Sequence, residues 1–232
     1  MRLASWNCCG KYGVNLLHLL DEGVDVAVIS EASALVEWPV VPDGRGLTGL
    51  SRRVSAESWK ELAVVARGPW SVSLHRDAES APAWMLPVHV DGPTPFTLVG
   101  LWSVVLPGMP SYVRQLDRAA DWIERSCAGE SVVLTGDFNA PIASSQRQYD
   151  VVERRLNSLG LVDAYRATRG LEPGDRPSEA TYYQYRRRER PFHIDHMMIP
   201  ESWADGVKLD VGDFDTWVGS GRSDHVPLIA DM

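Results

Sequence analysis

The stretch SVVLTGDFNA, residues 131–140, decides how the rest of the chain is interpreted. Its first half is apolar and rich in β-branched residues, which predicts a buried strand that stops at the Gly-Asp-x-Asn sequence. In an extended backbone, residues two apart lie on the same side, so Asp137 and Asn139 are expected to face one way. A carboxylate and a carboxamide placed in this way can share one phosphate or one water. The alternative is a plain strand-to-turn transition, in which Gly, Asp and Asn are common.

Other apolar runs along the chain also predict strands with polar ends. The first strand is expected at 2–7 and the second at 25–31, with a leucine-rich helix over 15–20 between them that Gly23 closes. The middle of the chain predicts strands at 61–67, 71–75, 84–90 and 96–102, helices at 112–126 and 151–160, and the central strand before Gly136. Strands at 181–185, 192–199 and 226–230 follow, and 36–59 reads as loop with some short strand. Many strands joined by tight turns favour antiparallel pairing.

Length and charge limit the classes of function. The chain has 232 residues, which predicts a single domain over 1–232. Its 23 Lys and Arg against 31 Asp and Glu give a net charge of −8, which argues against broad charge-driven binding along nucleic acid but leaves room for a local basic groove. The three cysteines form no disulfide framework, and the adjacent Cys8 and Cys9 are expected to be packing residues. The cysteines suit a reducing compartment and no apolar run is long enough to span a membrane, so we expect a cytoplasmic protein. We also expect a monomer.

Seven polar residues stand at the ends of predicted strands, where one sheet edge could gather them. They are Asn7, Glu31, Asp137, Asn139, Asp195, Asp224 and His225. Several carboxylates brought together repel one another unless a cation lies among them or some are protonated. Oxygen ligands of this kind suit Mg²⁺ or Mn²⁺ and not zinc, and such ions support phosphoryl chemistry.

Five motifs, in order, resemble the series found in the endonuclease/exonuclease/phosphatase superfamily. They are Trp6-Asn7, Ser30-Glu31, Gly136-Asp137-Phe138-Asn139, Ile194-Asp195-His196 and Ser223-Asp224-His225. The resemblance covers nearly the whole chain. It implies an α/β fold, a four-layer α-β-β-α sandwich with two mixed, mostly antiparallel sheets, and a metal-dependent hydrolase acting on phosphoester bonds.

The same resemblance implies a role for each site residue. Glu31 would hold the metal, with Asn7 and Asp224 contributing to the metal site. Asp137 would orient or deprotonate the attacking water, and Asn139 would hold a phosphate oxygen. His225 would donate to a phosphate oxygen while Asp195 fixes its tautomer.

Trp102 departs from the pattern of the related nucleases. They usually carry a residue near this position that can protonate the leaving group, whereas an indole donates a hydrogen bond but is no acid. Either Tyr112 or Ser103 takes the role, or the leaving group needs no acid. A second recurrent segment, Leu-x-Asp-x-x-Arg, supplies Asp163 and Arg166, which we interpret as a structural ion pair that holds a loop.

One basic and aromatic cluster, residues 182–190, leads into Asp195. Tyr183, Arg187 and Arg188 within it are candidate substrate-binding residues, because aromatic rings stack on bases and arginines bind phosphates. A solvated hairpin tip is an equally good interpretation. We therefore expect nucleic acid as the substrate, with a small phosphorylated metabolite or lipid head group, or binding without hydrolysis, as alternatives.

Overall fold

The computed structural model describes residues 1–33, 46–55, 58–172 and 174–232. The elements in chain order are β1 (Arg2–Asn7), α1 (Tyr12–Asp21), β2 (Val26–Ser33), β3 (Leu47–Arg53), β4 (Lys60–Arg67), β5 (Ser71–Leu74), η1 (Ala78–Ser80), β6 (Met85–Asp91), β7 (Phe96–Trp102), α2 (Tyr112–Ser126), β8 (Val132–Asp137), α3 (Gln146–Ser158), β9 (Leu161–Asp163), α4 (Ala164–Arg169), β10 (Tyr182–Tyr183), η2 (Gln184–Arg186), β11 (Pro191–Phe192), β12 (Asp195–Pro200), η3 (Glu201–Trp203), β13 (Lys208–Val211), η4 (Asp215–Gly219) and β14 (Leu228–Asp231). The strand-rich middle of the chain is thus present as predicted.

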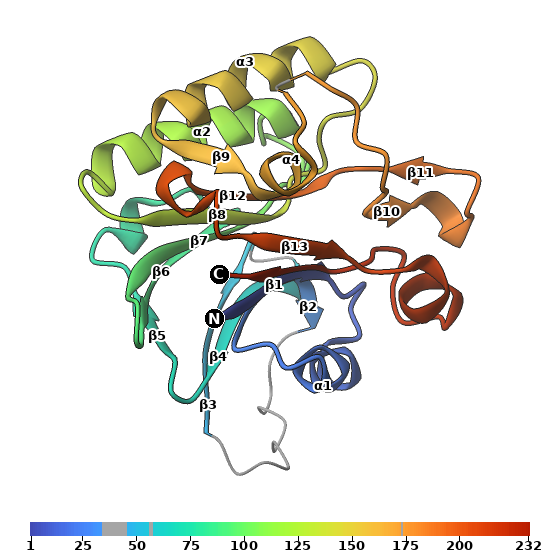
Figure 1. Ribbon diagram of the computed structural model, residues 1–232, viewed down its shortest axis with the longest axis horizontal. Coiled ribbons are helices and arrows are strands. Elements are labelled where there is room, and N and C mark those ends of the chain that lie inside the picture. The colour runs from blue at the N-terminus through green and yellow to red at the C-terminus, as the bar shows by residue number, and fades with distance from the viewer. Residues whose placement is uncertain (34–45, 56–57, 173) are drawn as a thin grey trace.

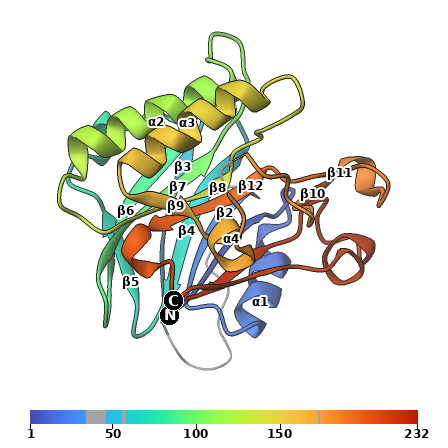
Figure 2. The same ribbon diagram turned by 45° about the horizontal axis from the view of Figure 1, so that its top comes forward.

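The strands form two six-stranded mixed sheets and one two-stranded ribbon, β10-β11. The first sheet has the order β13-β14-β1-β2-β4-β3 and the second β5-β6-β7-β8-β12-β9. Only the pairs β1–β2 and β7–β8 are parallel, and the others within the described sheets are antiparallel. The sheets lie face to face, with α2 and α3 outside the second and α1 outside the first (Figures 1 and 2). The predicted four-layer sandwich is confirmed.

The helices cover the sheets with one apolar face each. In α2, Val113, Leu116 and Ile123 are buried at helical spacing. α3 begins at Gln146 and not at the predicted 151, because Tyr149 extends the same buried stripe toward the N-terminus. Among the described residues, no helix combines the length and apolar character needed to cross a bilayer.

The C-terminal third differs most from the sequence prediction. The predicted strand over 181–185 is only β10, since Tyr185 and Arg186 adopt φ values of +58° and +57° and turn the chain. The predicted strand over 192–199 is split into β11 and β12, because the Thr181 hydroxyl accepts hydrogen bonds from the amides of residues 194 and 195. In the segment 36–59, β3 is the expected short strand, while 36–45 and 56–57 lie outside the described residues.

Candidate active site

Two neighbouring strands of the second sheet bring the carboxylates of Asp137 and Asp195 together. β8 ends at Asp137 and β12 begins at Asp195, and these residues are directly opposite in the antiparallel register. A Cβ on Gly136 would lie 1.8 Å from the carbonyl oxygen of Leu101 on β7, and its φ is +150°. Only glycine therefore allows β7 and β8 to approach at this point, which explains the Gly before Asp137.

Asp137 is held by two asparagines. Nδ2 of Asn7, at the end of β1, donates to Oδ2 at 2.9 Å, and the backbone N–H of Asn139 donates to Oδ1 at 2.9 Å. Burial raises the pKa of Asp137 to about 7, with a further rise from the Asp195 carboxylate that outweighs the opposite effect of His225 and the hydrogen bonds. The site thus holds a carboxylate that lacks a full cationic partner.

His225 forms the second half of the cluster. Its Nδ1 donates to Oδ2 of Asp195 at 2.8 Å, and the Tyr182 ring lies 4.6 Å from the imidazole. Burial disfavours the charged imidazolium, but the charge and hydrogen bond of Asp195 outweigh it and raise the pKa of His225 to about 9. Within the described part of the chain, Nε2 of His225 has no hydrogen-bond partner, and it is not among the fully enclosed polar atoms. That nitrogen is therefore open to an incoming ligand.

The loop that carries His225 is fastened to β1. The Ser223 hydroxyl donates to the carbonyl of Asn7 at 2.6 Å and accepts from the amide of His225. The indole of Trp6 donates to the carbonyl of His225 at 2.9 Å. These bonds place the imidazole between the two large sheets, where Asp195 meets it.

Asn139 does not follow the predicted extended geometry. Its φ is +50°, so the chain turns directly after the strand instead of continuing straight. The side-chain amide donates to the carbonyl of Ser103 at 2.9 Å and fixes the loop after β7. Asn139 still reaches Asp137, but through its backbone amide.

Glu31 and Asp224 lie on the neighbouring side of the site, around Cys9. Glu31 is not the last residue of β2, which continues to Ser33 past a register shift, and its φ is +55°. Burial raises the pKa of the Cys9 thiol, and the charges of Asp224 and Glu31 raise it further, which shows that both carboxylates are close. Lys60, which the sequence analysis did not single out, forms an ion pair with Glu31. A lysine at the start of a predicted strand carried no signal of this contact.

The donor set fits a hard divalent cation. Ligand atoms of Asp137, Asp195 and His225 lie within 4.8 Å of one another. Oδ1 of Asp195 is buried and has no hydrogen-bond partner in the described structure. Carboxylate and amide oxygens beside uncompensated negative charge are what Mg²⁺ and Mn²⁺ bind. Glu31 and Asp224 are not part of this group of atoms.

The leaving-group side contains both candidates that the sequence offered beside Trp102. Trp102 is buried next to Asp137 in the parallel register, as expected for a packing residue. Ser103 is buried, and its hydroxyl has no partner among the described residues. Burial raises the pKa of Tyr112, and the charge of Asp137 adds to it, so this phenol lies near the reacting side of the cluster.

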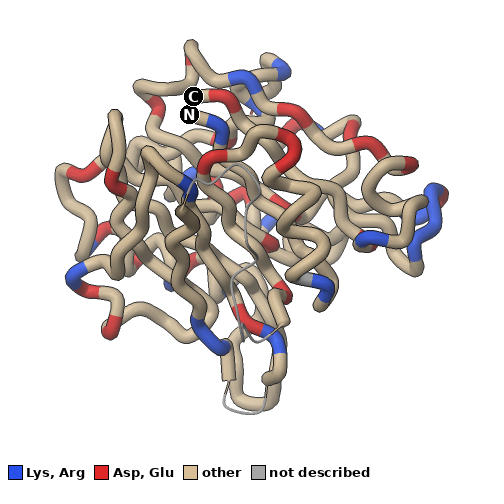
Figure 3. The backbone as a smooth tube through the Cα atoms, turned by 90° about the horizontal axis from the view of Figure 1, so that it is seen from below, with Lys and Arg blue, Asp and Glu red and all other residues tan. Residues whose placement is uncertain are grey.

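The basic cluster forms a projecting hairpin from β10 to β11, and Figure 3 shows its Lys and Arg positions at the right-hand end of the molecule. Tyr183 packs edge-on against Phe214 at 4.7 Å, so its ring is partly used in packing. Arg188 pairs with Asp215 and covers Phe214. Arg187 is exposed at the tip.

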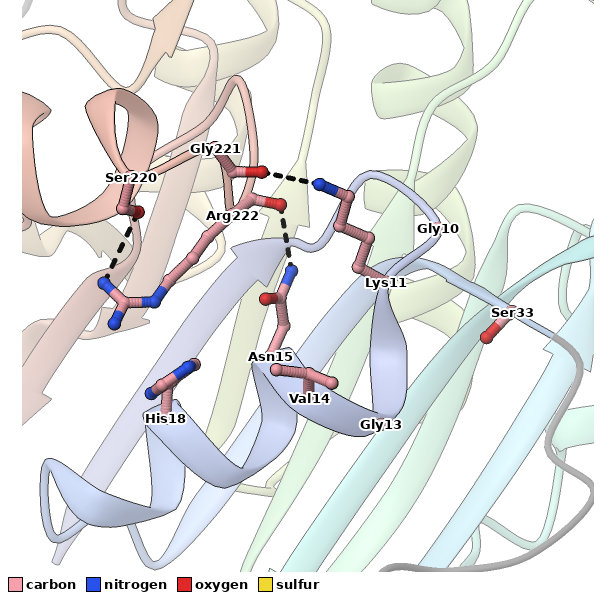
Figure 4. Close-up of a pocket in the computed structure, with 10 residues that line it drawn as sticks. All are labelled: Gly10, Lys11, Gly13, Val14, Asn15, His18, Ser33, Ser220, Gly221 and Arg222. Carbon is pink, nitrogen blue, oxygen red and sulfur yellow. Dashed lines mark hydrogen bonds between the residues drawn. The ribbon is translucent and has the colours of Figure 1, made fainter.

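A pocket of about 620 Å³ borders the site between α1 and the loop after η4 (Figure 4). Lys11 and Arg222 line it, together with His18. The Lys11 ammonium donates to the carbonyl of Gly221 at 2.6 Å, and Asn15 ties the carbonyls of residues 8 and 222 together. The sequence analysis did not find this pocket, because its basic residues come from opposite ends of the chain.

Asp163 and Arg166 are structural, although they do not pair with each other's side chain. Asp163 caps α4 and contacts His196 at 2.9 Å. Arg166 pairs with Glu153 at 2.6 Å and donates to the carbonyls of Glu172 and Asp175, so it does hold the following loop. Cys8 is buried as expected, whereas Cys9 is only partly buried.

The chain is similar to known proteins in sequence and in fold. The model of the Endonuclease/Exonuclease/phosphatase family matches residues 4–225. The 3′ phosphatase NExo from Neisseria, solved with a product DNA hairpin, is 18% identical with a TM-score of 0.70, covering 100% of this chain and 99% of its own. An AP endonuclease from Archaeoglobus fulgidus is 17% identical with a TM-score of 0.70 and the same coverage. The endonuclease domain of the telomere-specific non-LTR retrotransposon TRAS1 is 19% identical with a TM-score of 0.66, covering 99% and 96%.

No curated protein sequence matches the chain significantly. The structural likenesses establish the fold, and the family match covers almost all of the sequence. Members of this family are hydrolases that act on phosphoester bonds and typically depend on a divalent metal, which confirms the enzyme class expected from the motifs. The match over residues 4–225 shows that the chain belongs to the endonuclease/exonuclease/phosphatase family.

Proposed function

We propose that the protein is a Mg²⁺-dependent phosphoesterase that hydrolyses a phosphodiester bond in nucleic acid, with Mn²⁺ as a substitute ion. The observation that carries this proposal is the buried Asp137, Asp195 and His225 cluster, whose atoms lie within 4.8 Å and whose imidazole Nε2 is open. The unpartnered oxygen of Asp195 adds negative charge beside this cluster, which favours a cation at the neighbouring Asn7, Glu31 and Asp224.

Each residue of the cluster has a distinct task in this proposal. Asp137 accepts a proton from the attacking water or orients it, and the two asparagine donors hold its carboxylate in place. The imidazolium of His225 donates from Nε2 to a non-bridging phosphate oxygen, because Nδ1 is engaged by Asp195. Asn139 fixes the loop after β7 with one of its two amide hydrogens, which leaves the other to hold a phosphate oxygen.

The metal site would be formed by Asn7, Glu31 and Asp224. When bound, the ion supplies positive charge for the phosphate oxygens as negative charge develops there. On the leaving-group side, Tyr112 is the better placed of the two candidates. Burial and the Asp137 charge raise its pKa and keep the phenol protonated, whereas the Ser103 hydroxyl is enclosed.

Basic residues in the pocket between α1 and the loop after η4 and on the hairpin favour a long phosphodiester as substrate. Lys11 and Arg222 line the pocket beside Glu31, and Arg187 stands exposed on the hairpin. A polynucleotide has phosphates on both sides of the scissile bond that such charges can bind. NExo, a relative in fold, binds a DNA hairpin product, which supports the same class of substrate here.

The primary test is hydrolysis of a substrate panel with Mg²⁺. We expect cleavage of DNA or RNA oligonucleotides, loss of cleavage with EDTA, and a loss of about 10³-fold or more in kcat for Asp137→Asn and Glu31→Gln. Circular dichroism and thermal unfolding control for folding. Unaltered rates in both variants on every phosphoester tested would refute the assignment of the site.

The second candidate is a phosphatase for a small phosphorylated metabolite or lipid head group, which the net charge of −8 favours. Substitutions in the β10–β11 hairpin distinguish the nucleic-acid substrate from the small phosphorylated substrate. Arg186→Ala/Arg187→Ala should weaken binding of a single-stranded oligonucleotide and lower the slope of log K against log salt by about 1.4, at about 0.7 per phosphate contact.

The matched control is Arg118→Ala/Arg147→Ala, which removes the same charge from exposed positions on α2 and α3. It should leave the salt slope unchanged. An equal slope in both double variants, combined with faster turnover of small phosphomonoesters than of oligonucleotides, would favour the second candidate.

A further inference from the structure

The Lys60 ammonium contacts Oε2 of Glu31, the acid proposed as a metal ligand. Both side chains are partly buried, with 25% of Lys60 and 22% of Glu31 exposed. An ion pair that is shielded in this way is stronger than one on an open surface. The carboxylate that a metal would need is therefore already neutralised by the chain itself.

The backbone holds Lys60 over this carboxylate. Lys60 begins β4 and lies opposite Ser33, two residues after Glu31 in β2. The Ser58 hydroxyl accepts from the amide of Lys60 and donates to its carbonyl, which fixes the start of the strand. The Lys60 ammonium lies 5.1 Å from the Trp59 ring, and that ring packs closely on Gly10. Lys60 is thus tied to the β1–α1 loop as well as to β2.

We propose that Lys60 is a tethered counter-ion that competes with the divalent metal for Glu31. This inference rests on the proposed function, because it takes Glu31 to be a metal ligand. In the metal-free protein the ammonium neutralises Glu31. Metal binding must displace it, since a divalent ion and an ammonium on one carboxylate repel each other.

The competition couples the metal to the substrate. A phosphate that enters beside Glu31 attracts the Lys60 ammonium that the metal has displaced. Bound phosphate therefore stabilises the state in which Glu31 binds the metal. By linkage, the metal must tighten phosphate binding by the same factor by which phosphate tightens metal binding. Lys60 would make the enzyme take up its ion mainly together with an anionic substrate.

The test is binding of Mn²⁺ alone, measured as free Mn²⁺ by electron paramagnetic resonance without substrate. Lys60→Met should bind Mn²⁺ about tenfold more tightly than the unmodified protein, because the competing charge is gone. Lys11→Met is the matched control. Its ammonium binds the carbonyl of Gly221 and pairs with no carboxylate among the described residues, so the Mn²⁺ affinity of this variant should change less than about twofold.

A second measurement adds inorganic phosphate. Phosphate should tighten Mn²⁺ binding by the unmodified protein more than by Lys60→Met. Lys60→Gln, which keeps a polar side chain without the charge, should behave like Lys60→Met and guards against a folding defect in either variant. The competition is refuted if the unmodified protein binds Mn²⁺ and both Lys60 variants bind it equally or more weakly. If neither the unmodified protein nor the variants bind Mn²⁺, the proposed metal-dependent function falls together with the competition.

Discussion

Two Asp–His pairs of nearly equal geometry lie around β12, and only one is open to a ligand. Asp195 meets His225 at 2.8 Å, and Asp163 meets His196 at 2.9 Å. All four residues are buried. Asp195 and His196 are neighbours on one strand, so their side chains point to opposite faces of the sheet.

The pairs differ in what the second ring nitrogen meets. Nε2 of His196 faces the carbonyl of Ala140 at 3.0 Å, and the rings of Phe138 and Tyr149 lie 5.2 Å away. Nε2 of His225 meets no group within the described structure. An Asp–His contact alone therefore says little about catalysis, and the environment of the remaining nitrogen separates a structural pair from a reactive one.

The largest expected effect is that of His225→Asn. Removing the imidazole that donates to the phosphate should lower kcat by about 10³-fold, because a preorganised donor to developing charge is lost. The buried Asp195 also loses its partner, so the free energy of unfolding should fall as well, and kcat is compared at a temperature where the variant is folded. Steady-state kinetics on the best substrate and calorimetry measure both. If the folded variant keeps nearly full activity, the open Nε2 of His225 does not distinguish a reactive Asp–His pair from a structural one.

His196→Asn should lower stability but largely keep activity. It leaves the buried Asp163 carboxylate without the imidazole that it contacts, so the free energy of unfolding should fall by about 3 kcal/mol. At a temperature where the variant is folded, kcat should fall less than about tenfold. Urea unfolding and kinetics on the same preparation test this.

The double variant His196→Asn/Asp163→Asn provides the control for that measurement. It removes the unpaired charge, so part of the lost stability should return. A double variant that is no more stable than the single one would contradict a charge-based role for this pair.

The smallest effect is a pH dependence from His193, which packs against His196 with ring centroids 5.1 Å apart. Burial lowers the pKa of His193 from 6.5 to about 4, with a further lowering from His196. The unfolded chain takes up the proton near pH 6.5 and the folded chain only near pH 4, so falling pH across this window favours unfolding. The contribution is at most about 3 kcal/mol.

His193→Phe is the comparison for this titration. Its stability should depend less on pH between 7 and 4 than that of the unmodified protein, measured by urea unfolding at each pH. If the stability of both proteins depends on pH in the same way, the pKa of His193 does not differ between the folded and unfolded states.

The motifs at strand ends could be predicted because each depends on a local pattern. An apolar run followed by Gly-Asp or Ile-Asp predicts a strand and its polar end. The family resemblance then predicts which of these strand ends lie near one another. Helix starts were less certain: α3 begins earlier than predicted because Tyr149 is buried by contacts that local periodicity does not reveal. The prediction for Asn139 was wrong because it assumed an extended backbone from Asp137 to Asn139, whereas Asn139 has a positive φ.

Local patterns in the sequence were enough to predict the two-sheet sandwich, the enzyme family and a set of acids, amides and imidazole at strand ends. Which of these groups face each other depends on how the sheets and loops pack. The tertiary structure placed Lys60 on Glu31, set Lys11 beside the loop at 220–222, and turned His196 into the core while leaving Nε2 of His225 open. The reason is that burial and charge pairing depend on contacts between residues 29 to 210 positions apart, and no local pattern records such contacts.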